Sequence, residues 1–227
     1  MPASLPASPA SPAPRPRPGA RPMARLAGAL YLLIIGTGLS AEFALRGPLL
    51  ASPSPLANIA AAAPAFRLSL LGDLVMLLAD VTLALLFFQL LRGVSAPLAL
   101  AAMVFRLMQA ALIGMGLILL SQVPVLADQP GLATAILGIH ATGYDVALVF
   151  FGVNSALLAL LLHRGGAVPR ILVLAMGGSA AVYVSGGVLR LVAPRGEEVW
   201  SEASHAAFMQ RLQDEENRRK SIYGVDS

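Results

Sequence analysis

Long apolar stretches and short polar breaks alternate along most of the chain. Five of the stretches have about twenty residues or more, which is the length that an α-helix needs to cross the hydrocarbon of a bilayer. They run over Met23–Phe43, Leu68–Leu91, Leu98–Ser121, Leu132–Leu162 and Ile171–Val192. The pattern predicts an all-α fold, a polytopic transmembrane helical bundle of about five spans.

The two ends of the chain differ from this pattern. Residues 1–22 hold eight of the 17 prolines and little that could be buried, which is typical of a disordered Pro/Ala-rich tail. Residues 194–227 are polar, with apolar side chains at helical spacing at Trp200, Ala203, Ala207, Phe208 and Leu212. We therefore divide the chain into the disordered tail (1–22), a transmembrane helical domain (23–193) and a polar C-terminal tail (194–227) with an amphipathic helix. A short solvated helix is the alternative for that last segment.

Two of the apolar stretches allow a second interpretation. The first follows basic residues and ends near small ones, so a cleaved signal peptide is the alternative to a first span. The fourth has 31 residues and would be about 46 Å long as a helix, so it must tilt, kink near Gly138 or Gly143, or project beyond the bilayer. Between the first two spans, Arg46–Ala65 predicts a loop with a short helix around Pro55–Ala63.

Arginines near the ends of the spans indicate an orientation. With a cytoplasmic amino terminus, most of them fall on the cytoplasmic side, as the positive-inside rule requires. These are Arg15, Arg17, Arg21, Arg25, Arg92, Arg164 and Arg170. The opposite side receives Arg46, Arg67 and the basic end of the C-terminal tail. We expect a multi-pass membrane protein whose amino terminus is cytoplasmic and whose main partner is the lipid bilayer.

Composition excludes several classes of function. The chain is 57% hydrophobic and only 12% charged, which no ordinary soluble domain can accommodate. Its net charge of +4 comes from span ends and tails rather than from a basic stripe with aromatic residues, so we expect no nucleic-acid partner. The chain has no cysteine, and its three histidines have no metal-binding spacing. We predict no metal and no cofactor, and no nucleotide-binding loop or catalytic triad is visible.

Polar residues inside the spans fall into two layers when depth is counted at about 1.5 Å per residue from the cytoplasmic end of each span. The inner layer holds Arg106 and Asn154 at about 12 Å, and Asp80 and Gln109 at about 17 Å. The outer layer holds Glu42, Asp73, Tyr144 and Asp145 near 27 Å, with Arg46, Arg67 and His140 at about 33 to 36 Å. Charges inside a membrane are costly and usually face the interior of a bundle, so both layers are candidates for a site.

The inner layer predicts an ion pair. Arg106 and Gln109 share one face of their span, so Asp80 on the neighbouring antiparallel span can reach the guanidinium. Asn154 lies at the same depth. Hydrogen bonds between helices commonly fix their register in lipid, so we interpret Asp80, Arg106, Gln109 and Asn154 as structural.

The outer layer has more carboxylates than nearby partners. Unpaired acids at low dielectric can carry protons, and the layer would also suit a cation or a small ligand. His140 and Tyr144 are four residues apart and share a face, whereas Asp145 points elsewhere, so Asp73 is the better acidic partner for either of them. We select Asp73, Asp145, Tyr144, His140, Glu42 and Arg67 as candidates for a ligand or proton site, with a structural polar network as the alternative.

Several blocks of sequence resemble a known family. ARLAGALYLLIIGTGL, FRLSLLGDLVMLLADVTLALLFFQLLR, FRLMQAALIGMGLILL and GYDVALVFFGVNSALLALLLHRGGAVPRIL, within Ala24–Leu174, are similar to the bacterial membrane proteins grouped as domain of unknown function 4386. The resemblance implies a bacterial cytoplasmic (inner) membrane protein and marks Arg67, Asp73, Asp80, Arg106, Gln109, Tyr144 and Asp145 as its polar positions. It implies no activity. Members of that family continue into a further apolar helix, whereas Pro194–Ser227 is charged here.

Three hypotheses follow from the sequence. The first is a bundle that binds, senses or transports a small ligand or a proton through its outer acidic layer. The second is an intramembrane enzyme that uses His140, Tyr144 and Asp73. The third is a structural or assembly subunit whose polar residues hold helices together, with a protein partner or a second copy left open.

Overall fold

The computed structural model describes residues 20–51, 54–126, 128–166 and 168–193, and all their regular structure is helical. Within these ranges, five helical stretches are long and apolar enough to cross a membrane: Arg21–Leu50, Ala63–Leu91, Ala96–Leu126, Pro130–Gly165 and Arg170–Val192. The all-α bundle expected from the sequence is therefore confirmed. The predictions for residues 1–19 and for the C-terminal segment 194–227 lie outside the described residues.

The first membrane-length stretch is longer than expected at both ends. Helix α1 (Ala20–Leu39) begins three residues before Met23 and continues into a π-helical segment η1 (Ser40–Arg46) and a short helix α2 (Gly47–Leu50). A π-helix is wider than an α-helix and often occurs where a site needs a particular side-chain direction. Arg46, expected at the start of a loop, therefore lies inside a helix.

The remaining helices follow the apolar pattern closely. The loop helix α3 (Pro55–Ala61) leads into α4 (Ala63–Leu91). It is followed by α5 (Ala96–Ser121), the short 3₁₀ helix η2 (Val123–Leu126), α6 (Pro130–Gly165) and α7 (Arg170–Val192). A proline stands in the first turn of α3, α4, α5 and α6, where the missing N–H costs no hydrogen bond. Gly166, with φ 61°, adopts the left-handed conformation that ends α6.

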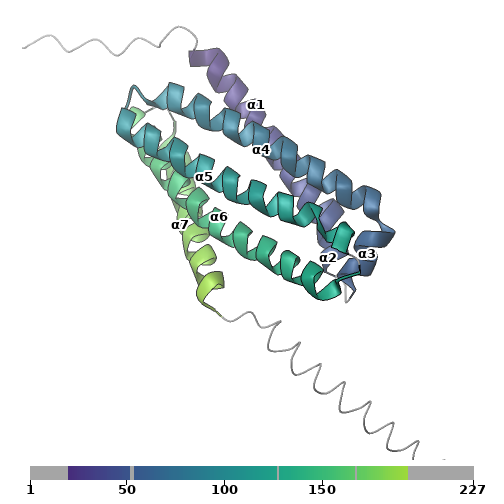
Figure 1. The fold of residues 1–227 in the computed structure, drawn as a ribbon. Coiled ribbons are helices and arrows are strands. Elements are labelled where there is room, and N and C mark those ends of the chain that lie inside the picture. Colours follow the sequence, from purple (N-terminus) through teal and green to yellow (C-terminus); the bar gives the residue numbers. More distant parts are fainter. Residues whose placement is uncertain (1–19, 52–53, 127, 167, 194–227) are drawn as a thin grey trace, which may run out of the picture.

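The helices form an open row rather than a closed ring. Helix α1 packs on α4, α4 on α5, α5 on α6 and α6 on α7, while α1 and α7 share no packed interface among the described residues. Figure 1 shows α4, α5 and α6 side by side, with α1 crossing behind α4 and α7 behind α6. Helix α6 has 36 residues and is continuous through Gly138 and Gly143.

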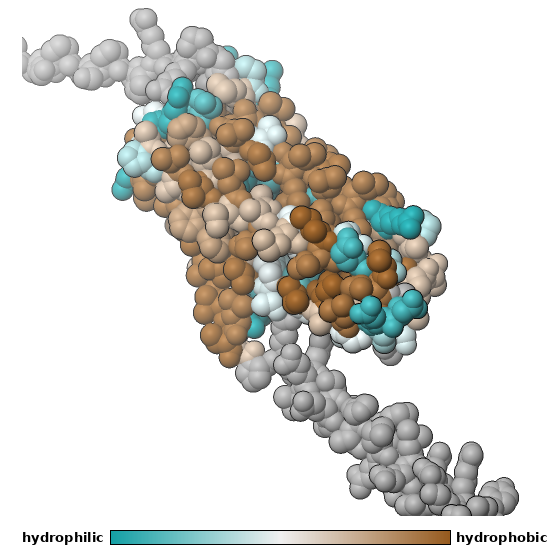
Figure 2. Space-filling view, in the orientation of Figure 1, coloured by the Kyte–Doolittle hydropathy of each residue, from teal (hydrophilic) through white to brown (hydrophobic). Residues whose placement is uncertain are grey.

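The surface of the row is suited to lipid. Large apolar side chains such as Leu32, Phe43, Ile118, Leu174 and Val192 are exposed. Figure 2 shows apolar side chains covering the sides of the bundle, with polar patches toward its ends. An exposed apolar belt on membrane-length helices is the arrangement that a bilayer requires.

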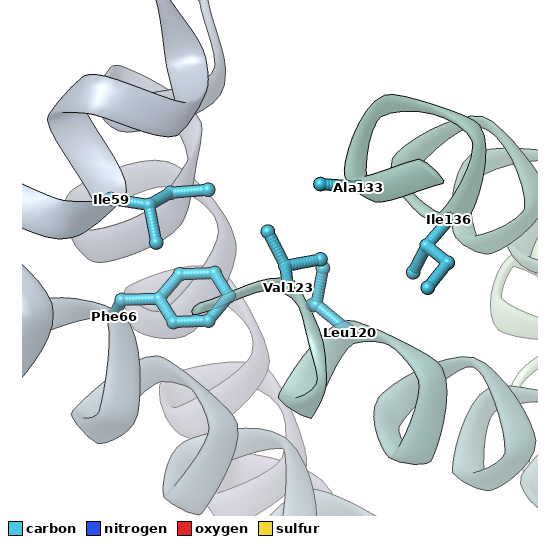
Figure 3. Packing of buried hydrophobic residues seen from close by; sticks show 6 residues of the cluster. All are labelled: Ile59, Phe66, Leu120, Val123, Ala133 and Ile136. Atoms are coloured by element: carbon cyan, nitrogen blue, oxygen red, sulfur yellow. The ribbon is translucent and has the colours of Figure 1, made fainter. Parts of the chain in front are cut away.

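The core is concentrated at the contacts between neighbouring helices. One cluster joins α3, α4, α5, η2 and α6 through Ile59, Phe66, Leu120, Val123, Ala133 and Ile136 (Figure 3). It fixes the loop helix α3 against the end of the bundle where α5 ends and α6 begins.

Helices α6 and α7 approach each other through glycines. A Cβ atom on Gly152 would come within 2.6 Å of Val184 Cγ2, and one on Gly187 within 2.7 Å of Val149 Cγ2. Small residues allow this close backbone packing, which is common between helices in membranes. The contact sets the position of the C-terminal half of α7.

Candidate functional site

The inner polar layer is built around Arg106 on α5. Its Nη2 lies 2.5 Å from Asp80 Oδ1 on α4, and Gln109 Nε2 donates to Asp80 Oδ2 at 3.1 Å. Arg106 Nη1 donates to the hydroxyl of Tyr31 on α1 at 3.3 Å. The pairing of Asp80 with Arg106 and Gln109 is the one expected from the sequence.

The surroundings of Arg106 explain how a charge is accommodated there. The residue is only 2% exposed, and its guanidinium lies 5.3 Å from the ring centroid of Tyr31 and 5.7 Å from that of Phe151. Such contacts with aromatic faces stabilise a desolvated cation. Arg106 therefore ties α1, α4, α5 and α6 together at one depth.

Asn154 lies near this layer but does not join its hydrogen bonds. The residue is buried on α6 and, with Arg106, borders a small packing gap. Its Nδ2 has no hydrogen-bond partner among the described residues. The sequence placed Asn154 at the correct depth, yet the amide does not contribute to the ion pair.

The outer layer has a different composition, because one arginine serves two carboxylates. Arg46 Nη1 lies 2.5 Å from Asp73 Oδ2 on α4, and Arg46 Nη2 lies 2.5 Å from Glu42 Oε2 within η1. Arg46 is 2% exposed, whereas the side chain of Glu42 is 46% exposed. From the sequence we expected more carboxylates than partners in this layer. Glu42 and Asp73 do have a partner, which they share, because the π-helical extension of α1 brings Arg46 into the bundle.

Asp145 also has an arginine. Arg190 Nη1 on α7 donates to Asp145 Oδ1 on α6 at 2.9 Å. The side chain of Arg190 is 61% exposed and that of Asp145 is 9% exposed. The close approach of α7 at Gly187, one turn before Arg190, positions this contact. Asp145 is therefore not an unpaired acid either.

His140 and Tyr144 lie one turn apart on α6. Their ring centroids are 6.5 Å apart, and both residues are half-buried. The carboxylate of Asp73 bonds to Arg46, and among the described residues no hydrogen bond joins it to His140 or Tyr144. The acidic partnership that the sequence suggested for these two residues is absent from this arrangement.

Arg67 does not take part in the site. It is exposed on α4 and forms no ion pair with any residue that the structure describes. It does not line the cavity described below. Its place on α4 agrees with a position near the membrane surface.

A large cavity connects the two layers. It has a volume of about 1040 Å³ and is lined by residues from α1, η1, α2, α4, α5, α6 and α7. Polar residues from both layers line it, and the ones used below are Glu42, Arg46, Arg106, His140, Tyr144 and Arg190. Asp73 does not line it but lies behind Arg46. The rest of the wall is mainly apolar, with Ile34, Leu39, Met76, Ile113 and Leu148 among its side chains.

The cavity lies between the two ends of the helix row. Tyr31 and Leu39 come from α1, while Ser179 and Tyr183 come from α7. Because α1 and α7 share no packed interface among the described residues, no described helix closes this side.

The donor chemistry of the layers is that of ion pairs rather than of a metal centre. Within the described ranges, no group of three or more His, Cys, Asp or Glu side chains is placed to hold a metal ion. The arginines occupy the positions next to the carboxylates that a cation would need. The arrangement can hold a polar group of a ligand at its edge and an apolar group along its walls.

Three residues of the cavity wall are not among the site candidates chosen from the sequence, although counting depth along each span could have found them. Tyr31 lies eight residues after Met23, at about 12 Å, which is the depth of Arg106. Arg190 lies 19 residues after Ile171, at about 28 Å, which is the depth of Asp145. Tyr183 lies between these layers at about 18 Å.

Comparisons with known proteins identify a family and no function. No curated protein and no solved structure matches the chain. The model of a family described as domain of unknown function (DUF4386) matches residues 26–212, which is further than the resemblance over Ala24–Leu174 extends. The match covers most of the sequence and reaches all five membrane-length helices. The chain therefore belongs to the DUF4386 family.

Proposed function

We propose that this integral membrane protein binds a small, membrane-soluble molecule in the cavity between α1 and α7. The observation that carries the proposal is the volume of about 1040 Å³, at the upper end of the range of ligand sites, bordered mainly by apolar side chains with a few convergent polar groups and open on the side between α1 and α7. A structural bundle of this size would gain stability by filling such a space, because empty volume forfeits packing contacts.

The open side of the row supports entry from the bilayer. Helices α1 and α7 are the least buried of the five membrane-length stretches and share no packed interface among the described residues. A molecule dissolved in lipid could pass between them without crossing a layer of packed side chains. The proposal therefore favours a lipophilic ligand over a water-soluble one.

The pairing of the acids favours a ligand over proton transfer. Proton carriage was expected from carboxylates without partners, and each of Glu42, Asp73 and Asp145 instead lies beside an arginine. The proton-transfer hypothesis depends on acids that have no such partner. The same pairs present fixed hydrogen-bonding groups at the cavity edge, which suits recognition of a polar head.

Co-purifying lipids test the proposal. We expect the protein, purified in a mild detergent and extracted with organic solvent, to yield a molecule that mass spectrometry detects in about equimolar amount. Ala175→Trp, on the cavity wall in α7, should remove most of it because the indole fills the space. Ala181→Trp is the matched control, since Ala181 is exposed on the same helix and does not line the cavity. Equal amounts from both variants, or no molecule from any form, would contradict the proposal.

We also propose that the amino end of α1 lies on the cytoplasmic side of a bacterial inner membrane. Arginines mark one end of the bundle, where α1 and α7 begin and α4 and α6 end: Arg21, Arg25, Arg92, Arg164 and Arg170. The cysteine-free chain allows a direct test. In spheroplasts, a membrane-impermeant maleimide should label Asp128→Cys at once and Gly93→Cys only after lysis. The reverse pattern would invert the orientation.

A further inference from the structure

The charges around the cavity do not balance. In the described part of the bundle, the ion pairs of the two polar layers join the carboxylates Glu42, Asp73, Asp80 and Asp145 to the arginines Arg46, Arg106 and Arg190, and the exposed Arg67 takes no part in them. The inner pair and the Arg190–Asp145 pair are each one to one. Arg46, however, serves two carboxylates, so one negative charge is left in the outer layer.

That charge is accessible at Glu42. Asp73 is 5% exposed and does not line the cavity, whereas Glu42 lines it and has a side chain that is 46% exposed. Arg46 Nη2 donates to Glu42 Oε2, and no described residue donates to Oε1. His140 lines the same cavity and is counted as neutral in this balance. Glu42 Oε1 can therefore accept a hydrogen bond from a cation in the cavity.

The rest of the wall suits an organic cation. The rings of Tyr144 and Phe43 line the cavity together with Glu42, and aromatic faces attract cations. Within the described ranges no cluster of three acidic or imidazole groups could hold a metal ion. Apolar side chains of α1, α5 and α6 provide room for an alkyl chain deeper in the cavity.

We propose that the cavity binds a monocationic amphiphile, with an ammonium head at Glu42 and an apolar chain between α1 and α7. This inference rests on the proposed ligand-binding function and adds the charge of the ligand. An anion of the same shape would meet the excess negative charge of the Glu42–Arg46–Asp73 group, and a neutral molecule would gain only the apolar contacts.

Three probes that share one alkyl chain test the inference: decylammonium, decanoate and decanol. Binding to the full-length protein in nanodiscs of a zwitterionic phospholipid is measured by calorimetry, and the heat of empty nanodiscs is subtracted. We expect decylammonium to bind at least about tenfold more tightly than decanoate, the factor that a charge-assisted hydrogen bond supplies, with decanol in between. Glu42→Gln should bring the ratio of the two affinities to about one while decanol still binds.

Asp128→Asn is the matched control, because it removes the same charge from an exposed loop position away from the cavity and should leave the ratio unchanged. A wild-type protein that binds decanoate as tightly as decylammonium overturns the charge inference, and so does a preference that survives in Glu42→Gln. In both cases binding of decanol keeps the proposed function. If none of the three probes binds the wild-type protein, the proposed function fails together with the inference. If Glu42→Gln does not fold, the comparison of decylammonium with decanoate on the wild-type protein still tests the charge inference.

Discussion

The two polar layers use the same chemistry in opposite ways. In the inner layer, Arg106 faces one carboxylate, is covered by the rings of Tyr31 and Phe151, and is only 2% exposed where it borders the cavity. In the outer layer, Arg46 is shared between two carboxylates, one of which, Glu42, is half exposed. An ion pair with equal and well-covered charges holds helices together. A group with one extra carboxylate, exposed at its edge, can still bind a ligand. Position in the bundle, rather than residue type, separates a structural charge from a candidate site.

The largest expected effect is at Arg106. We predict that Arg106→Met lowers the free energy of unfolding by about 3–5 kcal/mol, because Asp80 is left as a buried charge without a cation. The measurement is thermal unfolding of the detergent-purified protein, followed by circular dichroism. Asp80→Leu together with Arg106→Met should recover most of the loss, since both charges are then gone. If the single variant is as stable as the wild-type protein, the Asp80–Arg106 pair is not structural and the difference proposed between the two layers is wrong.

An intermediate effect is expected at the glycine contact that places Arg190. Gly187→Ala adds a Cβ that would lie 2.9 Å from the backbone oxygen of Asp145, and we expect it to cost about 1–3 kcal/mol as α7 moves away from α6. The same unfolding experiment measures it. Gly186→Ala is the control, because a Cβ there meets nothing within 4 Å and alanine favours the helix. Equal loss in both variants would show that the close approach does not hold the outer layer in place.

The smallest effect on stability is expected at Glu42. Glu42→Gln should change the free energy of unfolding by less than about 1 kcal/mol, because its ion pair with Arg46 is half exposed and Arg46 keeps Asp73. Chemical or thermal unfolding of Glu42→Gln and Arg106→Met under the same conditions measures the difference between the two losses of stability. A loss at Glu42 as large as the loss at Arg106 would mean that the outer layer is structural as well.

The sequence predicts the helices and the inner layer well, for a simple reason. Apolar length identifies each span, and counting 1.5 Å per residue brings Asp80 to the depth of Arg106 and Gln109, which is where the structure joins them. These properties depend on position along a straight helix and need no knowledge of packing. The short helix expected around Pro55–Ala63 is also present, as α3.

The outer layer was predicted less well, because it depends on local deviations and on the packing of the last helix. The sequence predicts a loop at Arg46, since nothing in the apolar pattern shows that α1 continues through a π-helical segment. Arg190 does not stand out near the end of the last span, where a basic residue is usual. Asp73 is one of the candidates from sequence, yet it lies behind Arg46 and outside the cavity wall. The cavity itself depends on how the helices rotate and close, which depth counting does not address.

The open side of the helix row would make the bilayer a part of the binding site proposed above. In a membrane, acyl chains would form the remaining wall where α1 and α7 do not meet, and these chains would compete with any guest for the same apolar surface. The affinity measured at such a site is the preference of this surface for the guest over the lipid chains that the guest displaces. Its natural unit is therefore the mole fraction of the guest in the membrane, and a change in lipid composition would act on occupancy as a change in the protein does.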